Sequence, residues 1–160
     1  MQEKQKINIV WFKKDVRTKD QISLFKASQE DLPFIALYIF DEDFYQKKQF
    51  DFKKIGKFRA KFLLESVQDL QHNLAELNIP FLTKFGKTKE IFEKLNEHYS
   101  IQKIFCEGEF TQEEVDLEKS VSSALSNVKF EKSYSQFLLE PDFVFGKLEK
   151  IPALFTTFRN

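Results

Sequence analysis

The sequence has few glycines, prolines and cysteines, and each shortage limits what the chain can be. Four glycines and four prolines in 160 residues argue against long flexible loops. The single cysteine, Cys106, cannot form an internal disulfide, so nothing points to secretion. The opening residues, MQEKQK, lack the apolar core of a signal peptide, and no apolar run approaches the roughly 20 residues of a membrane span. We therefore expect a cytoplasmic protein without a membrane partner.

The chain also lacks any excess of charge. Lysine plus arginine and aspartate plus glutamate each number 25, which gives a formal net charge of zero. A dedicated nucleic-acid binder should show a basic excess, so that class is disfavoured. Hydrophobic residues make up 42% and charged residues 31% of the chain, which is typical of a globular protein. One domain of this length can form a core without a disulfide or a metal.

Several sequence motifs for cofactor chemistry are absent. The first apolar run is not followed by G-x-G-x-x-G, and G-x-x-x-x-G-K-[ST] does not occur. Gly86, Lys87 and Thr88 resemble only the end of the second motif, so we interpret them as a strand-to-helix turn with Thr88 as the N-cap. His72 and His98 have no cysteine or histidine neighbour at metal-ligand spacing, so no metal site is predicted. No catalytic set is predicted either.

What is present is phenylalanine, with 20 residues, and a regular alternation of patterns. Short apolar runs predict strands at 7–12, 34–40, 81–85, 101–106 and 128–131. Apolar residues at helical spacing predict helices at 21–29, 57–77, 90–98 and 112–126. The connections are too long for hairpins, which is the pattern of a parallel sheet. The sequence therefore predicts an α/β fold, a Rossmann-like doubly wound five-stranded parallel sheet with helices on both faces.

The same patterns predict which side chains are buried. We expect most phenylalanines in the core and the short helix 21–29 to share a face through Ile22, Phe25 and Lys26. The inward stripe predicted for helix 57–77 consists of Phe58, Phe62, Leu63, Val67, Leu70, Leu74 and Leu77. Thr111 is predicted to cap helix 112–126, whose acidic start is predicted to be mostly a solvated face and contains Glu113, Glu114, Asp116 and Glu118.

The alternation ends after residue 134. We interpret 1–134 as the α/β domain and 135–160 as an irregular, aromatic-rich tail at the start of an interdomain linker. The chain stops on Phe155, Phe158 and Arg159 with no turn, cap or polar tail after them, and we expect a further domain to follow in a longer parent protein.

In doubly wound sheets, ligands bind beyond the carboxyl ends of the strands, where the strand order reverses. The residues at those ends are Phe12, Lys13, Lys14, Phe40, Asp41, Cys106, Glu107, Gly108 and Glu109. The pattern alone fits ordinary strand ends better than a site. Cys106 is more typical of a small core residue than of a nucleophile activated by His72 or His98.

Four segments together resemble one family. They are IVWFKKDVRTKDQISLFKA, FDFKKIGKFRAKFLLESVQDL, EFTQEEVDLEKSV and FTTFRN. In this order and spacing they resemble the N-terminal α/β domain of the DNA photolyase and cryptochrome family. FRAKFLLESV and TQEEVDLEKSV are the most specific and resemble the DASH-type cryptochrome branch.

The resemblance implies a role for the domain and for its parent. In the family, this domain helps to bind a light-harvesting antenna, commonly methenyltetrahydrofolate or a deazaflavin. A helical second domain binds FAD and damaged DNA, and excited FAD donates an electron to a cyclobutane pyrimidine dimer. The resemblance implies that these 160 residues are not an enzyme alone. The parent would be a deoxyribodipyrimidine photolyase, a carbon–carbon lyase, or a blue-light photoreceptor.

The resemblance also implies partners and an antenna half-site. Glu109 stands where folate-binding members place a carboxylate, which can accept two N–H groups of a pterin ring. Phe12, Lys13 and Asp41 complete the predicted cofactor-binding set. The partner would be the FAD-binding domain of the same parent, with DNA reached only through that parent. The isolated chain would be a monomer or a weak dimer.

Other residues match the family without an expected ligand contact. Asp15, Arg17 and Asp20 match the turn after the first strand, where we expect them to pin the loop. Lys13, Lys19 and Gln21 replace the arginine, histidine and asparagine that many members carry. The alternative to an antenna domain is a stand-alone small nucleotide-binding or partner-docking α/β module.

Overall fold

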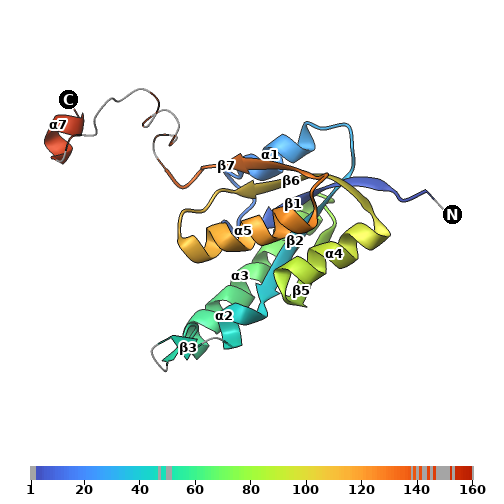
Figure 1. Ribbon diagram of the computed structural model, residues 1–160, viewed down its shortest axis with the longest axis horizontal. Coiled ribbons are helices and arrows are strands. Elements are labelled where there is room, and N and C mark those ends of the chain that lie inside the picture. Colours follow the sequence, from blue (N-terminus) through green and yellow to red (C-terminus); the bar gives the residue numbers. More distant parts are fainter. Residues whose placement is uncertain are drawn as a thin grey trace.

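A five-stranded parallel sheet forms the centre of the molecule (Figure 1). The computed structural model describes residues 3–46, 48, 49, 52–137, 139, 141, 144, 146, 152 and 154–159. The strands are β1 (Lys6–Phe12), β2 (Phe34–Asp41), β5 (Phe81–Gly86), β6 (Ser100–Glu107) and β7 (Lys129–Ser133). Their order is β5-β2-β1-β6-β7, and every neighbouring pair is parallel. The predicted fold class is confirmed.

Two helices cover each face of the sheet. The core on one face contains side chains of α1 (Ile22–Ser28) and α3 (Lys57–Glu76), together with Val10 and Phe12 of β1. The core on the other face contains Phe92 of α4 (Thr88–His98) and Val121 of α5 (Gln112–Ala124), packed on Ile9 and Trp11. Successive residues of β1 alternate between these cores, as the pleat of a strand requires.

β1 is the central strand, and the strand order reverses beside it. The chain moves outward from β1 to β2 and β5, then returns to β6 and β7 on the other side. The carboxyl ends of β1, β2 and β6 therefore meet at the edge where ligands bind in such sheets. Asn8 lies at the amino half of β1 and is fully buried. Within the described residues, neither polar atom of its amide has a hydrogen-bond partner.

The turn from β5 to α4 depends on a glycine. Gly86 has φ +141°, a conformation that side-chain-bearing L residues rarely adopt. The predicted turn is confirmed, but Thr88 is not the N-cap. Lys87 is the N-cap, and Thr88 is the first residue of α4, with its side chain buried.

Short elements occupy segments where none was predicted. The predicted connection 41–56 contains α2 (Glu42–Gln46) and the antiparallel pair β3 (Lys48–Gln49) and β4 (Phe52–Lys53). The tail, predicted to be irregular, contains the five-residue helix α7 (Phe155–Arg159). Asn160 and about half of the other tail residues lie outside the described part of the chain. No helix among the described residues is long and apolar enough to cross a membrane.

Several predicted buried faces are wrong. In α3 only Val67, Leu70 and Leu74 are buried, whereas Phe58 is 80% and Phe62 69% exposed. Phe58 precedes Val67 by about two and a half helical turns, so it lies on the opposite side of the helix. The expectation that most phenylalanines are core residues therefore needs correction. The exposed ones among the described residues are Phe25, Phe58, Phe62, Phe85, Phe110, Phe137 and Phe155.

The short helix α1 also buries a different face from the one predicted. Ser23, Leu24 and Ala27 are its buried residues, and Phe25 is 65% exposed. Gln21 caps the helix because its side-chain oxygen accepts the backbone N–H groups of Ser23 and Leu24. The predicted face of Ile22, Phe25 and Lys26 is therefore wrong, because Leu24 and Ala27 are the residues of α1 that pack in the core.

Candidate functional site

A pocket of about 250 Å³ lies at the carboxyl edge of the sheet. Its wall combines the ends of β1 and β2, α2, the first turns of α3 and α5, and the loop after β6. The lining residues are Trp11, Phe12, Lys13, Lys14, Tyr38, Ile39, Phe40, Asp41, Phe44, Tyr45, Ile55, Arg59, Phe62, Leu63, Thr88, Glu109, Glu114 and Leu117. All four predicted site residues are among them, so the structure brings Phe12, Lys13, Asp41 and Glu109 together.

Aromatic side chains form one wall of the pocket. Phe40 lies edge-on to Tyr38, with ring centroids 4.8 Å apart, and 6.4 Å from the ring of Tyr45. Trp11, the only tryptophan of the chain, is 2% exposed, packs in the core on the other face of the sheet and lines the pocket from that side. Burial raises the pKa of the Tyr38 hydroxyl, which therefore stays protonated. Such a wall suits stacking against a flat aromatic ligand.

The polar side of the pocket is a group of two carboxylates and one lysine. Lys14 Nζ lies 3.7 Å from Glu109 Oε2 and is paired more closely with Glu114. The Glu109 side chain is only 7% exposed, although Lys14 is 59% exposed. Thr111 Oγ1 donates to Glu114 Oε2 at 2.6 Å. Lys14 thus contacts both acidic side chains at the rim, and Lys13 and Arg59 line the same pocket.

This arrangement shifts the two acidic groups in opposite directions. Burial and the nearby Glu114 raise the pKa of Glu109 to about 7. Burial opposes ionisation of Glu114 as well, but hydrogen bonds from Lys14 and Thr111 outweigh it and lower the pKa of Glu114. Near neutral pH the pair therefore carries between one and two negative charges, and Glu109 is the member that exchanges a proton.

Lys13 is held by an acidic residue of α5. Lys13 Nζ lies 2.5 Å from Glu118 Oε1 and 5.1 Å from the ring centroid of Trp11. Glu118 is 3% exposed, and its other oxygen lies 2.5 Å from Lys132 Nζ. The expectation that the acidic start of this helix is a solvated face is therefore wrong for Glu114 and Glu118. Both face inward because each meets a lysine there.

Asp41 connects β2 to two helices. Its Oδ1 accepts the backbone N–H of Asp43 at 2.9 Å. Its Oδ2 accepts the backbone N–H of Thr88 at 3.1 Å and the Thr88 hydroxyl at 2.5 Å. These bonds fix the pocket wall at Asp41, while Phe12, which is 1% exposed, contributes apolar surface below it.

The turn after β1 is pinned as expected. Asp15 is buried and accepts the backbone N–H of Lys13 at 2.9 Å and the side-chain amide of Gln21. Burial raises the pKa of Asp15. Arg17 Nη2 donates to the Asp20 carbonyl at 3.3 Å and to Ser135 Oγ at 3.1 Å. Gln21, one of the departures from the family pattern, thus links the loop to α1.

Cys106 is a core residue rather than a nucleophile. It is fully buried in the core that faces α4 and α5, and burial raises the pKa of its thiol to about 12. His72 lies on α3, on the opposite face of the sheet, with a side chain 75% exposed. His98 contacts the carbonyl of Lys94 at the end of α4. No group of three or more metal-ligating side chains occurs among the described residues.

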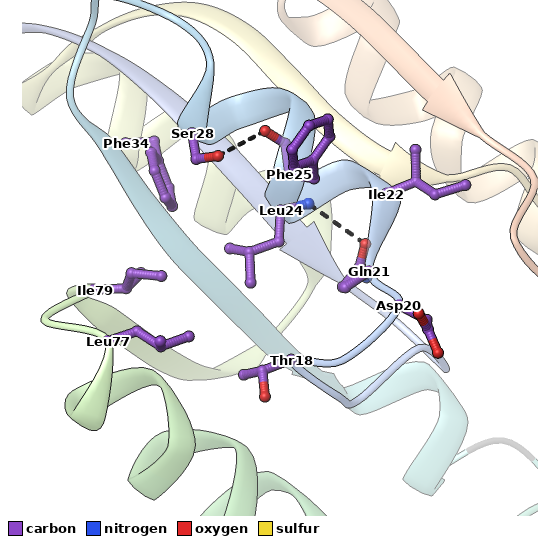
Figure 2. Close-up of a pocket in the computed structure, with 10 residues that line it drawn as sticks. All are labelled: Thr18, Asp20, Gln21, Ile22, Leu24, Phe25, Ser28, Phe34, Leu77 and Ile79. Carbon is purple, nitrogen blue, oxygen red and sulfur yellow. Dashed lines mark hydrogen bonds between the residues drawn. The ribbon is translucent and has the colours of Figure 1, made fainter.

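A second hollow lies beside α1 and, among the described residues, shares no lining residue with the first pocket (Figure 2). Figure 2 shows Leu24 and Phe34 facing it, together with Leu77 and Ile79 beyond the end of α3. Its volume is about 760 Å³, and it is open and mainly apolar. Two of its polar side chains serve α1 itself, since Gln21 caps the helix and Ser28 donates to the carbonyl of Phe25 at 2.7 Å. It therefore has fewer polar side chains available to a ligand than the pocket at the carboxyl edge.

Sequence reasoning missed several residues of the pocket. Phe44, Tyr45 and Arg59 come from the segment predicted to be a connection and from the first turn of α3. The sequence prediction places Glu114 on a solvated face, although Thr111 and Glu114 have the T-x-x-E spacing of a capping box. That spacing is the one sequence feature that predicts a specific contact for the Glu114 carboxylate.

The sequence is similar to proteins of one known family. The family profile described as DNA photolyase matches residues 8–160. The chain is 36% identical over 154 residues to Cryptochrome DASH of Gloeobacter violaceus, covering 95% of this chain and 31% of that protein. It is 30% identical over 159 residues to the chloroplastic/mitochondrial Cryptochrome DASH of Arabidopsis thaliana, covering 96% and 28%. The chain thus spans about a third of the length of these relatives.

Solved structures show the same similarity. The cryptochrome of Synechocystis sp. PCC6803 superposes with a TM-score of 0.90 at 27% identity, covering 99% of this chain and 33% of that one. The archaeal photolyase from Sulfolobus tokodaii, solved with two FAD molecules, has a TM-score of 0.75. At 19% identity over 96% of this chain and 34% of its own, that match shows the fold alone.

Proposed function

Because the chain belongs to the DNA photolyase family, we propose that it is the antenna-side domain of a photolyase or DASH-type cryptochrome. Its pocket at the carboxyl edge would bind the ring system of a light-harvesting chromophore. In the longer parent, the bound antenna would absorb light and pass its energy to FAD in a helical domain. Light-driven repair of cyclobutane pyrimidine dimers and blue-light sensing are the two activities that we propose for that parent.

The observation that carries the proposal is the position of Glu109 beside an aromatic wall. A carboxylate with a 7% exposed side chain faces a pocket lined by Trp11 and Phe40. A pterin ring presents N–H groups along one edge and a flat face, so it can donate to Glu109 while it stacks on the wall. The residues present therefore fit methenyltetrahydrofolate.

The size of the pocket supports a half-site. A volume of about 250 Å³ lies below the roughly 300–1,000 Å³ that encloses a drug-sized ligand. It suits one fused ring system, with the remainder of the ligand outside. We infer that a second domain would cover that remainder, so the isolated chain should bind weakly.

The charge state of Glu109 should control binding. When it is ionised, Glu109 can accept two N–H groups, whereas the protonated acid must donate at one oxygen. Because its pKa is raised to about 7, affinity should increase from about pH 6 to about pH 8. The charged groups around it are Lys13 and Lys14 at the end of β1, Glu114 on α5 and Arg59 on α3.

Trp11 provides a direct test because it is the only tryptophan and lines the pocket. Its emission should be quenched when 5,10-methenyltetrahydrofolate is added, and the Glu109→Gln variant should bind about tenfold more weakly. Glu113→Gln is the matched control, since its 61% exposed side chain lies outside the pocket. Equal binding by all three proteins would refute the assignment of Glu109.

Two other ligands complete the experiment. A deazaflavin would test the second antenna, and a flavin is included because the similar Sulfolobus tokodaii photolyase holds two FAD molecules. ATP tests the alternative of a nucleotide-binding module, and a thermal shift with ATP alone would favour that alternative. If none of the ring systems quenches Trp11 at millimolar concentration, the antenna proposal fails for this pocket.

A further inference from the structure

The loop after β6 places Glu109 between two residues that rest on Tyr134. Gly108 lies directly against the Tyr134 ring, and the ring centroid of Phe110 is 5.4 Å from that of Tyr134. Residues 108 and 110 both contact Tyr134, and the Glu109 side chain between them has other partners. It meets Lys14 and Glu114 at the pocket.

Gly108 has no space for a side chain. A Cβ built on it would lie 2.1 Å from Tyr134 Cε1 and 2.6 Å from Tyr134 Cζ, whereas contacts under 3.0 Å essentially never occur. Its backbone is also fixed, because its N–H donates to the Ser133 carbonyl at 2.7 Å and its carbonyl accepts from Gln136 Nε2 at 2.9 Å. The Tyr134 ring, rather than an unusual φ, is what requires glycine here.

Phe110 extends the same contact. Its ring packs against Tyr134 on one side and lies 5.0 Å, edge-on, from the ring of Phe137. Phe110 is 52% exposed, so these ring contacts rather than deep burial hold it in place. The segment that follows β7 therefore packs against the loop that carries Glu109.

We propose that Tyr134 is a positioning residue for Glu109. Its ring, seated on Gly108 and against Phe110, fixes the backbone from which the Glu109 carboxylate reaches Lys14 and Glu114. What Glu109 binds rests on the proposed function, but its position beside those two residues does not. None of the sequence motifs pointed to Tyr134, and it does not itself line the pocket.

The first test measures Glu109 itself. Carboxyl ¹³C NMR of the full chain would follow its titration in the wild type, in Tyr134→Phe and in Tyr134→Ala. Tyr134→Phe keeps the ring and should leave the titration unchanged. Tyr134→Ala should move the Glu109 midpoint by about one pKa unit toward the ordinary value, because the carboxyl moves away from Glu114. An unchanged midpoint in Tyr134→Ala would overturn the proposal.

The second test uses the steric conflict at Gly108. Gly108→Ala should lower the melting temperature by roughly 4 °C or more, while Gly146→Ala, where nothing lies within 4 Å of the new Cβ, should not. In the Tyr134→Ala background, Gly108→Ala should lower the melting temperature much less, because the ring that clashes with the new Cβ is absent. Equal costs in both backgrounds would show that the ring does not constrain Gly108.

The two proposals fail in different ways. If the Glu109 midpoint moves in Tyr134→Ala but no antenna binds the wild type, the positioning role stands and the proposed function fails. If the antenna binds the wild type and Tyr134→Ala changes neither the midpoint nor the affinity, the proposed function stands and the positioning role fails.

Discussion

Lys13 Nζ lies 2.5 Å from Glu118 Oε1, although 105 residues separate them in the sequence. The contact joins the end of the central strand β1 to α5. The second oxygen of Glu118 lies 2.5 Å from Lys132, next to the end of β7. One buried carboxylate therefore connects three elements at the edge that carries the pocket.

Removing this charge should be costly. Glu118→Gln removes the carboxylate that Lys13 and Lys132 share, and we expect a loss of about 3 kcal/mol in the free energy of unfolding. Glu65→Gln removes an exposed partner of Lys61 and should cost less than about 0.5 kcal/mol. Urea unfolding of both variants would measure the difference, and similar small losses would mean that the buried network contributes little.

The contact between Thr88 and Asp41 gives a second prediction. Thr88→Val keeps the shape of the side chain but removes the hydroxyl that donates to Asp41 at 2.5 Å. We expect a loss of about 1–2 kcal/mol because, among the described residues, the buried carboxylate keeps only the backbone N–H groups of Asp43 and Thr88. Thr83→Val, on the exposed part of β5, should change stability by less than about 0.5 kcal/mol. Chemical denaturation that shows no difference between the two would contradict this role of Thr88.

The raised pKa of Glu109 predicts how stability depends on pH. Its value rises from 4.5 to about 7 on folding, so between these values the folded state binds more protons than the unfolded state. The contribution of Glu109 to the free energy of unfolding therefore falls as the pH rises through that window. Relative to wild type, Glu109→Gln should gain roughly 1 kcal/mol between about pH 5 and about pH 8, since solvent screens part of the effect. Glu113→Gln controls for the loss of one charge, and a constant difference for Glu109→Gln would contradict the prediction.

Replacing Asn8 with leucine should increase the stability of the chain. It is fully buried in β1, and its amide has no partner within the described residues. Asn8→Leu has a similar size and no polar group to desolvate, so it should stabilise the chain by about 1 kcal/mol. Asn8→Asp should be strongly destabilising, because it buries a charge at the same place. A destabilised leucine variant in thermal unfolding would contradict the prediction that the buried amide is unfavourable.

The sequence was sufficient to predict the fold, because the fold follows from local patterns. Continuous apolar runs such as 34–40 indicate strands covered on both faces, and the predicted ends lie within two residues of the observed ones. The helical faces were less predictable. Phe58 and Phe62 fit a loose apolar spacing, but the stripe that the sheet accepts is set by Val67, Leu70 and Leu74.

The site was only partly predictable for a related reason. The topology alone brings the residues after β1, β2 and β6 to one edge, which is why Lys13, Asp41 and Glu109 line one pocket. The partner of each is a contact between distant segments, such as Lys13 with Glu118. No local pattern encodes such contacts, so the acidic start of α5 was assigned to solvent.

The strands of this sheet are synthesised in a different order from the order in which they lie side by side. The central strand β1 emerges first, but its Lys6 pairs with Ser100, so one of its two neighbours is translated much later. Until β6 is synthesised, one edge of β1 has no strand to pair with. The chain between β1 and β6 must lose conformational entropy before the contacts between these two strands can stabilise the sheet. We expect the nascent domain to stay open on that side, where a chaperone or a neighbouring nascent chain could reach β1, until translation passes Glu107.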